Sequence, residues 1–161
     1  MIRKLLPVLL LLVTFTFAAQ AQKQTAAQKA TIKADQITKF INSKITDKAQ
    51  HITATQSGKI KDAFVEFYAD KDALNIRKKK FGAAYKAFKA EAAKPVDKEG
   101  KAKLQEQKKE LIVENKAINK ETKEMQARRE DKIKEVLNAT QKVHFEAMRA
   151  EQAANRKEDQ K

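Results

Sequence analysis

The chain contains two histidines, at positions 51 and 144. A histidine acts as a general base or a metal ligand when a partner carboxylate or a second ligand stands at a defined spacing. His51 and His144 are 93 positions apart, and neither lies in a recognisable catalytic or zinc-binding motif. We therefore expect each to be a structural or solvent-facing histidine.

Other residues that could carry chemistry form incomplete motifs. Asp70-Lys71-Asp72 begins like a calcium loop but lacks the required glycine and the closing glutamate. The absence of cysteine excludes disulfides, thiolate metal sites and cysteine nucleophiles. Asn138-Ala139-Thr140 matches a glycosylation sequon, and the sequence has no glycine-rich phosphate loop. The sequence predicts no catalytic activity, no cofactor and no metal.

A five-residue pattern occurs twice, as ITATQ over 52–56 and as LNATQ over 137–141. Each copy has an apolar residue, an N-cap residue and a glutamine three positions after the cap. In this capping box, the cap side chain accepts from the backbone N–H at the third helical position, and the glutamine reaches back to the backbone N–H of the cap. Each copy predicts a bend followed by a new helix. The capping residues are Ile52, Thr53, Gln56, Leu137, Asn138 and Gln141.

The helices that position these motifs follow from apolar spacing. Ile37, Phe40, Ile41 and Ile45 recur at helical intervals, which predicts a short helix over about 26–48. Positions from 60 to 88 then step by four and three, which predicts a long helix over about 54–92. Seven of its nine seam positions are apolar, and packing against a partner helix is the simpler interpretation of this aromatic-rich stripe.

Pro95 interrupts the pattern, so residues 93–98 are predicted to be the turn of a helical hairpin, with Asp97 capping the next helix. That helix is expected over about 98–136. Its large apolar residues recur once per seven, a narrow stripe suited to an elongated arm. They are Leu104, Leu111, Ile118 and Met125. A short helix over about 139–153 follows, and residues 156–161 are predicted to be a frayed polar tail.

Together these elements predict an all-α fold, an elongated helical hairpin of long amphipathic helices with short flanking helices. Leu, Ile, Val and Phe supply 25 of the 140 residues after position 21, or ~18 %, which is low for a globular domain. A thick core within one copy of the chain is therefore not expected.

Residues 1–21 have the pattern of a secretory signal peptide. Arg3 and Lys4 precede an apolar run over 5–18, and an Ala-Gln-Ala cleavage site ends at Ala21. The run is shorter than the ~20 residues that a membrane span needs. The sequence predicts export, cleavage after Ala21 and a single helical domain over 22–155. Removal of the signal peptide lowers the formal charge from +14 to +12, which favours acidic clients, anionic lipid or polyanions as partners.

Two capping boxes separated by a helical hairpin in an exported basic chain resemble the periplasmic LTxxQ-motif family of Spy- and CpxP-like stress chaperones. The second copy is closest to that family, in the segment IKEVLNATQKVHFEAMR over 133–149. This chain differs from the pattern in having Ile52 in place of the first leucine, Asn138 in place of the second threonine, and a further helix before residue 50.

The resemblance implies a curved, thin protomer that pairs as a homodimer in the periplasm and an ATP-independent holdase that binds unfolding envelope proteins. Positive charge would attract a client, which exposed apolar side chains would then hold. The expected client-binding residues are Phe64, Phe67, Arg77, Lys78, Lys79, Lys80, Phe81, Tyr85 and Phe88. A merely solvated face is the alternative interpretation of the basic run over 77–80.

Two other functions fit the same sequence. One is an accessory regulator that docks on an envelope stress sensor, which the resemblance alone suggests. The other is a charge-driven protein that binds a polyanion or a membrane surface, for which affinity should fall steeply with salt. No feature predicts recognition of a specific nucleic acid.

Overall fold

The computed structural model describes residues 24–158, so the predicted signal peptide and residues 159–161 lie outside the described part. Four α-helices follow one another with one 3-10 turn, η1 (Lys48–Gln50), between the first two. The helices are α2 (Ala26–Lys44), α3 (Ala54–Ala92), α4 (Lys98–Val136) and α5 (Ala139–Glu158). Residues 24–158 contain no strand, and the predicted all-α helical hairpin is confirmed.

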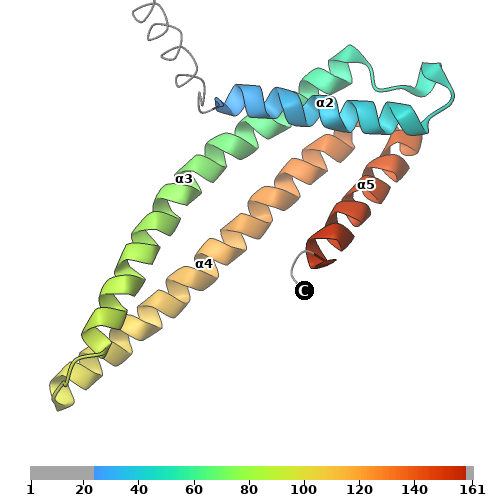
Figure 1. Cartoon of the computed structure of the whole chain (residues 1–161). Coiled ribbons are helices and arrows are strands. Elements are labelled where there is room, and N and C mark those ends of the chain that lie inside the picture. Colours follow the sequence, from blue (N-terminus) through green and yellow to red (C-terminus); the bar gives the residue numbers. More distant parts are fainter. Residues whose placement is uncertain (1–23, 159–161) are drawn as a thin grey trace, which may run out of the picture.

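The long helices α3 and α4 run side by side in opposite directions (Figure 1). A short turn around Pro95 joins them at the far end, and Asp97 Oδ1 accepts a hydrogen bond of 2.8 Å from the Gly100 N–H as α4 begins. A Cβ atom at position 100 would lie 3.0 Å from the Val96 Cβ, so the tightness of this turn favours glycine there.

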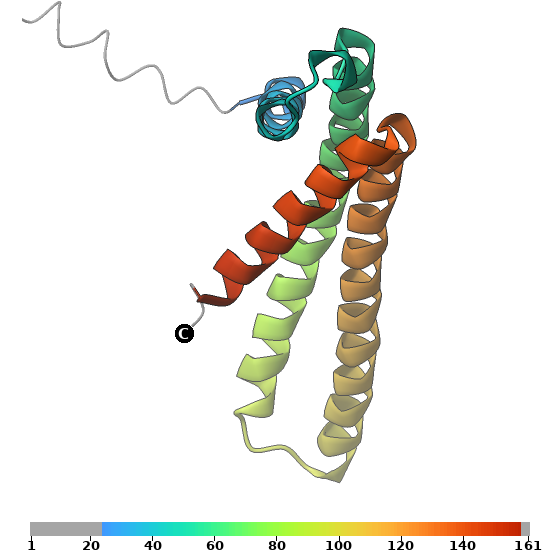
Figure 2. The same ribbon diagram turned by 90° about the vertical axis from the view of Figure 1, so that its right-hand side faces the viewer.

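The open end of the hairpin is covered by α2, which lies across it and packs on α3 and α5. The chain bends after α4, where Leu137 is extended at φ −88° and ψ 142°, and α5 then runs back at an angle to the hairpin, with its far end standing away from it (Figure 2). All four helices therefore meet at one end of the molecule, and only α3 and α4 extend to the other.

The main hydrophobic core lies at this four-helix end. Phe145, Ile41, Ile60 and Ile133 are each at most 1 % exposed. Branched and aromatic side chains at helical spacing from four different helices bury one another here. The buried members of this core are Ala30, Ala34, Ile37, Ile41, Ile45, Ile52, Ile60, Ala63, Phe64, Ile133, Leu137, Phe145 and Met148.

A smaller core between the two long helices consists of Leu74, Ile118 and Met125. Beyond it, every residue from 75 to 117 is at least partly exposed. Along this stretch the two helices have only each other to pack against, and they leave their seam partly open to solvent. We call this segment, residues 75–117, the arm.

The first helix is shorter than predicted. It ends at Lys44 and not near residue 48, because Ile45 is extended and Asp47 caps a separate turn by accepting a 2.9 Å hydrogen bond from the Ala49 N–H. The Asn42 side chain accepts another, of 2.8 Å, from the Ile52 N–H. Hydrogen bonds to polar side chains therefore end the helix earlier than the spacing of its apolar residues predicts.

The last helix is longer than predicted. It continues to Glu158, so residues 156–158 belong to α5 and not to a frayed tail. Ala153 and Ala154 have high helix propensity, and no glycine or proline follows them.

Across residues 24–158, no helix combines the length and the hydropathy that a bilayer crossing requires.

Candidate functional site

Both repeated motifs form complete capping boxes. The Thr53 hydroxyl accepts from the Gln56 N–H at 3.2 Å, and Gln56 Oε1 accepts from the Thr53 N–H at 2.9 Å. In the second copy, Asn138 Oδ1 accepts from the Gln141 N–H at 2.9 Å, and Gln141 Oε1 accepts from the Asn138 N–H at 3.0 Å. Asparagine therefore caps α5 as threonine caps α3.

The two glutamines also contact each other. Gln56 Nε2 donates to Gln141 Oε1 at 3.0 Å and to the Val136 carbonyl at 2.7 Å. Gln141 Nε2 donates to the Gln50 carbonyl at 2.9 Å, and the Gln141 side chain is 1 % exposed. A buried amide group has to find partners for its polar atoms, and here the two helix caps supply them for each other. We call this pair and its backbone partners the glutamine junction.

A third capping box was not anticipated. Thr25 and Gln28 start α2 with reciprocal hydrogen bonds of 2.8 and 3.2 Å. The sequence signal was present, because TAAQ over 25–28 has the same cap-to-glutamine spacing as the two repeated motifs. Unlike Gln141, the Gln28 side chain is exposed and makes no contact with another cap.

The predicted client-binding residues separate into two groups. Phe64 and Phe67 lie at the four-helix end, where their rings meet edge to face at 6.5 Å. Phe64 is only 6 % exposed and belongs to the main core, so its predicted place on a client-binding surface is wrong for this arrangement of the chain. Its burial follows from its place in the main core, to which α2, α4 and α5 also contribute side chains.

The second group lies on the arm. Phe81 and Phe88 are half-buried and Tyr85 is 42 % exposed. The rings of Phe81 and Tyr85 stack 6.1 Å apart, and the Lys89 ammonium lies 5.0 Å from the Tyr85 ring. These aromatic side chains are reachable from solvent.

Arg77 differs from the three lysines that follow it. Its guanidinium donates to both Glu114 oxygens, at 2.6 and 2.9 Å, and to Glu121 at 2.7 Å. The hydrogen bond from Arg77 lowers the pKa of Glu114, and the same bond raises the pKa of Arg77. Arg77 therefore joins α3 to α4 and is not available as the free charge that was predicted.

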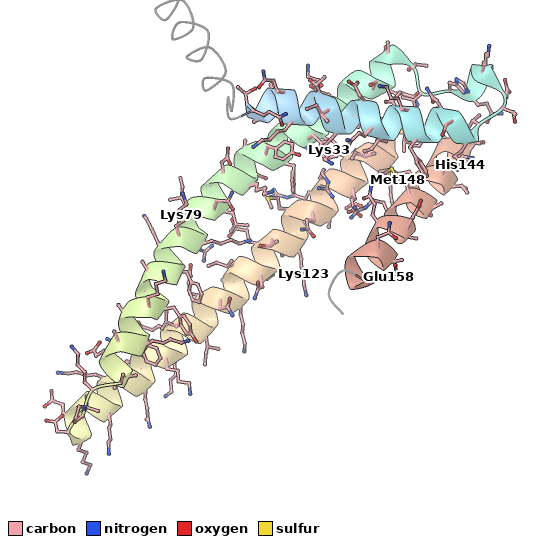
Figure 3. All side chains as sticks on the ribbon, viewed as in Figure 1. Lys33, Lys79, Lys123, His144, Met148 and Glu158 are labelled. Carbon is pink, nitrogen blue, oxygen red and sulfur yellow. The ribbon has the colours of Figure 1, made fainter. Side chains whose placement is uncertain are left out.

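Lys78, Lys79 and Lys80 are exposed. Lys79 lies on the outer side of α3, away from α4 (Figure 3). Of the predicted basic run, these three lysines remain accessible to an anionic partner.

Further apolar side chains stand exposed on the arm. Ile76 is 60 % exposed, Ile112 46 % and Val113 67 %. An open groove of about 350 Å³ lies between α3 and α4, with Ala84, Ala87, Phe88 and Leu111 among its lining residues. The arm thus offers apolar surface on both helices.

The two histidines lie on different elements, His51 at the bend before α3 and His144 on α5. The His51 ring donates from Nε2 to the Ile45 carbonyl at 2.9 Å, which fixes the bend after α2. His144 is half-exposed on α5. No group of three or more His, Cys, Asp or Glu within residues 24–158 is arranged to hold a metal ion.

The chain was compared with family models, with curated proteins and with solved structures, and none of the three comparisons found a match.

Proposed function

We propose that this protein is an ATP-independent holdase chaperone of the periplasm, similar to the LTxxQ-motif family, and that its arm binds unfolding envelope proteins. One observation carries the proposal. No residue of the arm is buried, although the arm contains Phe81, Tyr85, Phe88, Leu104 and Leu111. Apolar side chains at helical spacing that a protomer leaves partly exposed are typical of a binding surface.

The charge of the arm supports the same function. Residues 75–117 hold thirteen Lys and Arg against six Asp and Glu, a formal charge of +7. Positive potential of this kind attracts acidic chains over a Debye length of ~8 Å at physiological ionic strength. Half-covered aromatic side chains then supply short-range contacts that do not depend on a particular client sequence.

A homodimer would fit the same surface. A second copy that packs antiparallel on the arm would cover part of its apolar stripe and leave the remainder for clients. The proposal therefore predicts that dimerisation and client binding involve overlapping sets of arm residues.

Light scattering of a chemically unfolding client tests the function. The mature protein, residues 22–161, would be added without nucleotide, at low salt and at ~0.5 M salt, where Debye screening is strong. A holdase should suppress aggregation at both, because apolar contacts survive screening. Absence of suppression at both salt concentrations, with several clients, would refute the proposed function.

Binding to an anionic surface is the second candidate, and the exposed Lys78–Lys80 run favours it. It predicts that suppression disappears at high salt and that affinity for anionic vesicles or a polyanion falls as a power of salt concentration. Docking on a stress sensor predicts instead a saturable complex with one sensor domain and no protection of unrelated clients.

A further inference from the structure

A cleft of about 260 Å³ lies at the four-helix end, outside the arm. Side chains from all four helices line it, and Figure 3 marks two of them, Lys33 on α2 and Met148 on α5. Phe67 and Tyr68 contribute an aromatic wall from α3. The cleft therefore exists only where the four helices meet.

Four cationic side chains line this cleft, and none of its lining residues is an aspartate or glutamate. They are Lys33, Lys71, Arg129 and Arg149. Glu130 lies beside the cleft, and its Oε1 accepts from both arginines, from Arg129 at 3.1 Å. One carboxylate thus serves two guanidiniums, which leaves an excess of positive charge.

Arg129 is held in a desolvated position. Its guanidinium carbon lies 4.5 Å from the Phe67 ring centre and 5.3 Å from that of Phe64, and its side chain is 13 % exposed. The Nε atoms of Arg129 and Arg149 are buried and have no hydrogen-bond partner in residues 24–158. Burial lowers the pKa of Arg129, and the charge of Arg149 lowers it further. An anion in the cleft would offset both effects.

We propose that this cleft binds a carboxylate of an unfolded client, an aspartate or glutamate next to an apolar residue. The guanidiniums and lysines would bind the carboxylate, and the rings of Phe67 and Tyr68 would contact the apolar neighbour. The inference rests on the proposed holdase function, because it names the client segment that a second site, separate from the arm, selects.

Size and charge favour a peptide carboxylate over larger anions. Sites for drug-sized ligands measure about 300–1,000 Å³, so a cleft of about 260 Å³ suits one or two side chains. A nucleic acid or a vesicle surface would engage exposed charges over a long stretch, whereas Arg129 is largely enclosed. A guanidinium fork also matches the planar geometry of a carboxylate.

The test uses a synthetic twelve-residue peptide with a Glu-Leu-Asp-Phe centre and no tyrosine or tryptophan, and a matched peptide with Gln-Leu-Asn-Phe. Isothermal titration with the mature protein gives the affinities. We expect the acidic peptide to bind about tenfold more tightly, a difference of ~1.4 kcal/mol.

Two double variants locate the binding. Lys33→Gln with Lys71→Gln removes two exposed cleft lysines, and Lys78→Gln with Lys79→Gln removes the same charge from the arm. The cleft variant should weaken binding of the acidic peptide about fivefold, and the arm variant less than about twofold, because ion pairs act locally at physiological salt. Equal losses in both variants would overturn the cleft site in favour of general charge attraction.

Tyrosine fluorescence reports on the cleft directly. The chain has two tyrosines and no tryptophan, so a Tyr85→Phe variant leaves Tyr68, in the cleft wall, as the only tyrosine. Addition of the acidic peptide should change the fluorescence emission of Tyr68. The affinity derived from that change should equal the affinity found by isothermal titration. An unchanged emission on saturation, or an equal response to inorganic phosphate alone, would overturn the peptide assignment.

The two proposals fail separately. If the acidic peptide shows no preference while aggregation of clients is still suppressed, the cleft inference is wrong and the holdase function stands. If no client is protected at either salt concentration, the proposed function itself is wrong, and the cleft would lose its role in client selection with it.

Discussion

Gln56 Nε2 donates a hydrogen bond of 3.0 Å to Gln141 Oε1, although 85 positions separate the two residues. Each glutamine uses its oxygen to cap its own helix and its nitrogen to reach a partner elsewhere in the chain. The junction therefore joins the starts of α3 and α5 and helps to fix the angle at which α5 returns. The cleft depends on that angle, because Met148 and Arg149 of α5 form part of its wall.

Gln141→Ala should destabilise the protein by about 2–3 kcal/mol. The substitution removes the glutamine half of the α5 capping box, so the Asn138 N–H, the Gln50 carbonyl and Gln56 Nε2 each lose a hydrogen-bond partner. Urea unfolding should show a lower midpoint with an unchanged slope. Gln28→Ala, in the exposed box of α2, is the control and should cost no more than about 1 kcal/mol. Equal losses would mean that the junction adds nothing to capping.

A double-mutant cycle measures the contact between the glutamines. Gln56→Ala and Gln141→Ala should be non-additive by about 1 kcal/mol, because the first substitution already removes the hydrogen bond between them. The same cycle with Gln28→Ala in place of Gln56→Ala should be additive within about 0.5 kcal/mol. Additivity in both cycles would contradict an energetic role for the contact.

Phe145→Ala should destabilise the four-helix end by about 3–5 kcal/mol, since a ring that is 1 % exposed leaves a cavity in the main core. Val143→Ala, two positions earlier and 65 % exposed, should change stability by less than about 0.5 kcal/mol. Thermal unfolding followed by circular dichroism at 222 nm provides the comparison.

The bridge from Arg77 to Glu114 should make the arm sensitive to acid. Arg77 lowers the pKa of Glu114, so this contribution to stability is present above the usual pKa of about 4.3 and is lost as pH falls through the lowered value. Glu114→Gln should therefore lower the melting temperature at pH 7, and its difference from the wild type should shrink toward pH 3.

Glu106→Gln is the matched control, an exposed glutamate on the same helix with the same loss of charge. Its melting temperature should remain close to that of the wild type across the pH range. A pH-independent difference for Glu114→Gln would show that the ion pair is not its source.

Val113→Lys tests the role of the arm in client binding. It removes an apolar side chain that is 67 % exposed on the arm, and Val143→Lys makes the same change at a side chain that is 65 % exposed on α5. Loss of about 1 kcal/mol of apolar contact corresponds to about fivefold weaker affinity for the client. We expect this loss for Val113→Lys and not for Val143→Lys. The measurement is the protein concentration that halves client light scattering at ~0.5 M salt, where added charge has little effect. Equal shifts would place the client-binding surface elsewhere.

Local signals in the sequence were sufficient for the helices and for three of their starts, which Thr53, Asp97 and Asn138 cap. The ranges 54–92 and 98–136 follow from apolar spacing, Pro95 and Asp97, all of which act within a few residues of where they stand. The sequence did not predict the helix end that is set by hydrogen bonds to polar side chains. Asn42 and Asp47 end α2 early through hydrogen bonds to a reversing backbone, a geometry that spacing alone does not encode.

The candidate sites depended more on tertiary structure. The stripe of α3 has aromatic residues near both of its ends, yet Phe64 is enclosed in the main core with side chains of the other three helices while Tyr85 is exposed on the arm. Likewise, Arg77 is one of four consecutive basic residues, and only its position opposite Glu114 and Glu121 makes it a bridge. Residues of the same type therefore have different roles according to what lies across from them.

The sequence by itself determined that this chain forms long amphipathic helices with capped starts and an excess of positive charge, because helix spacing, capping and composition are local properties. Only the tertiary structure decided that Gln56 meets Gln141, that four cationic side chains line one cleft, and that the arm has no buried residue. Those features arise from contacts between helices whose residues are tens of positions apart, and no local pattern specifies which faces will meet.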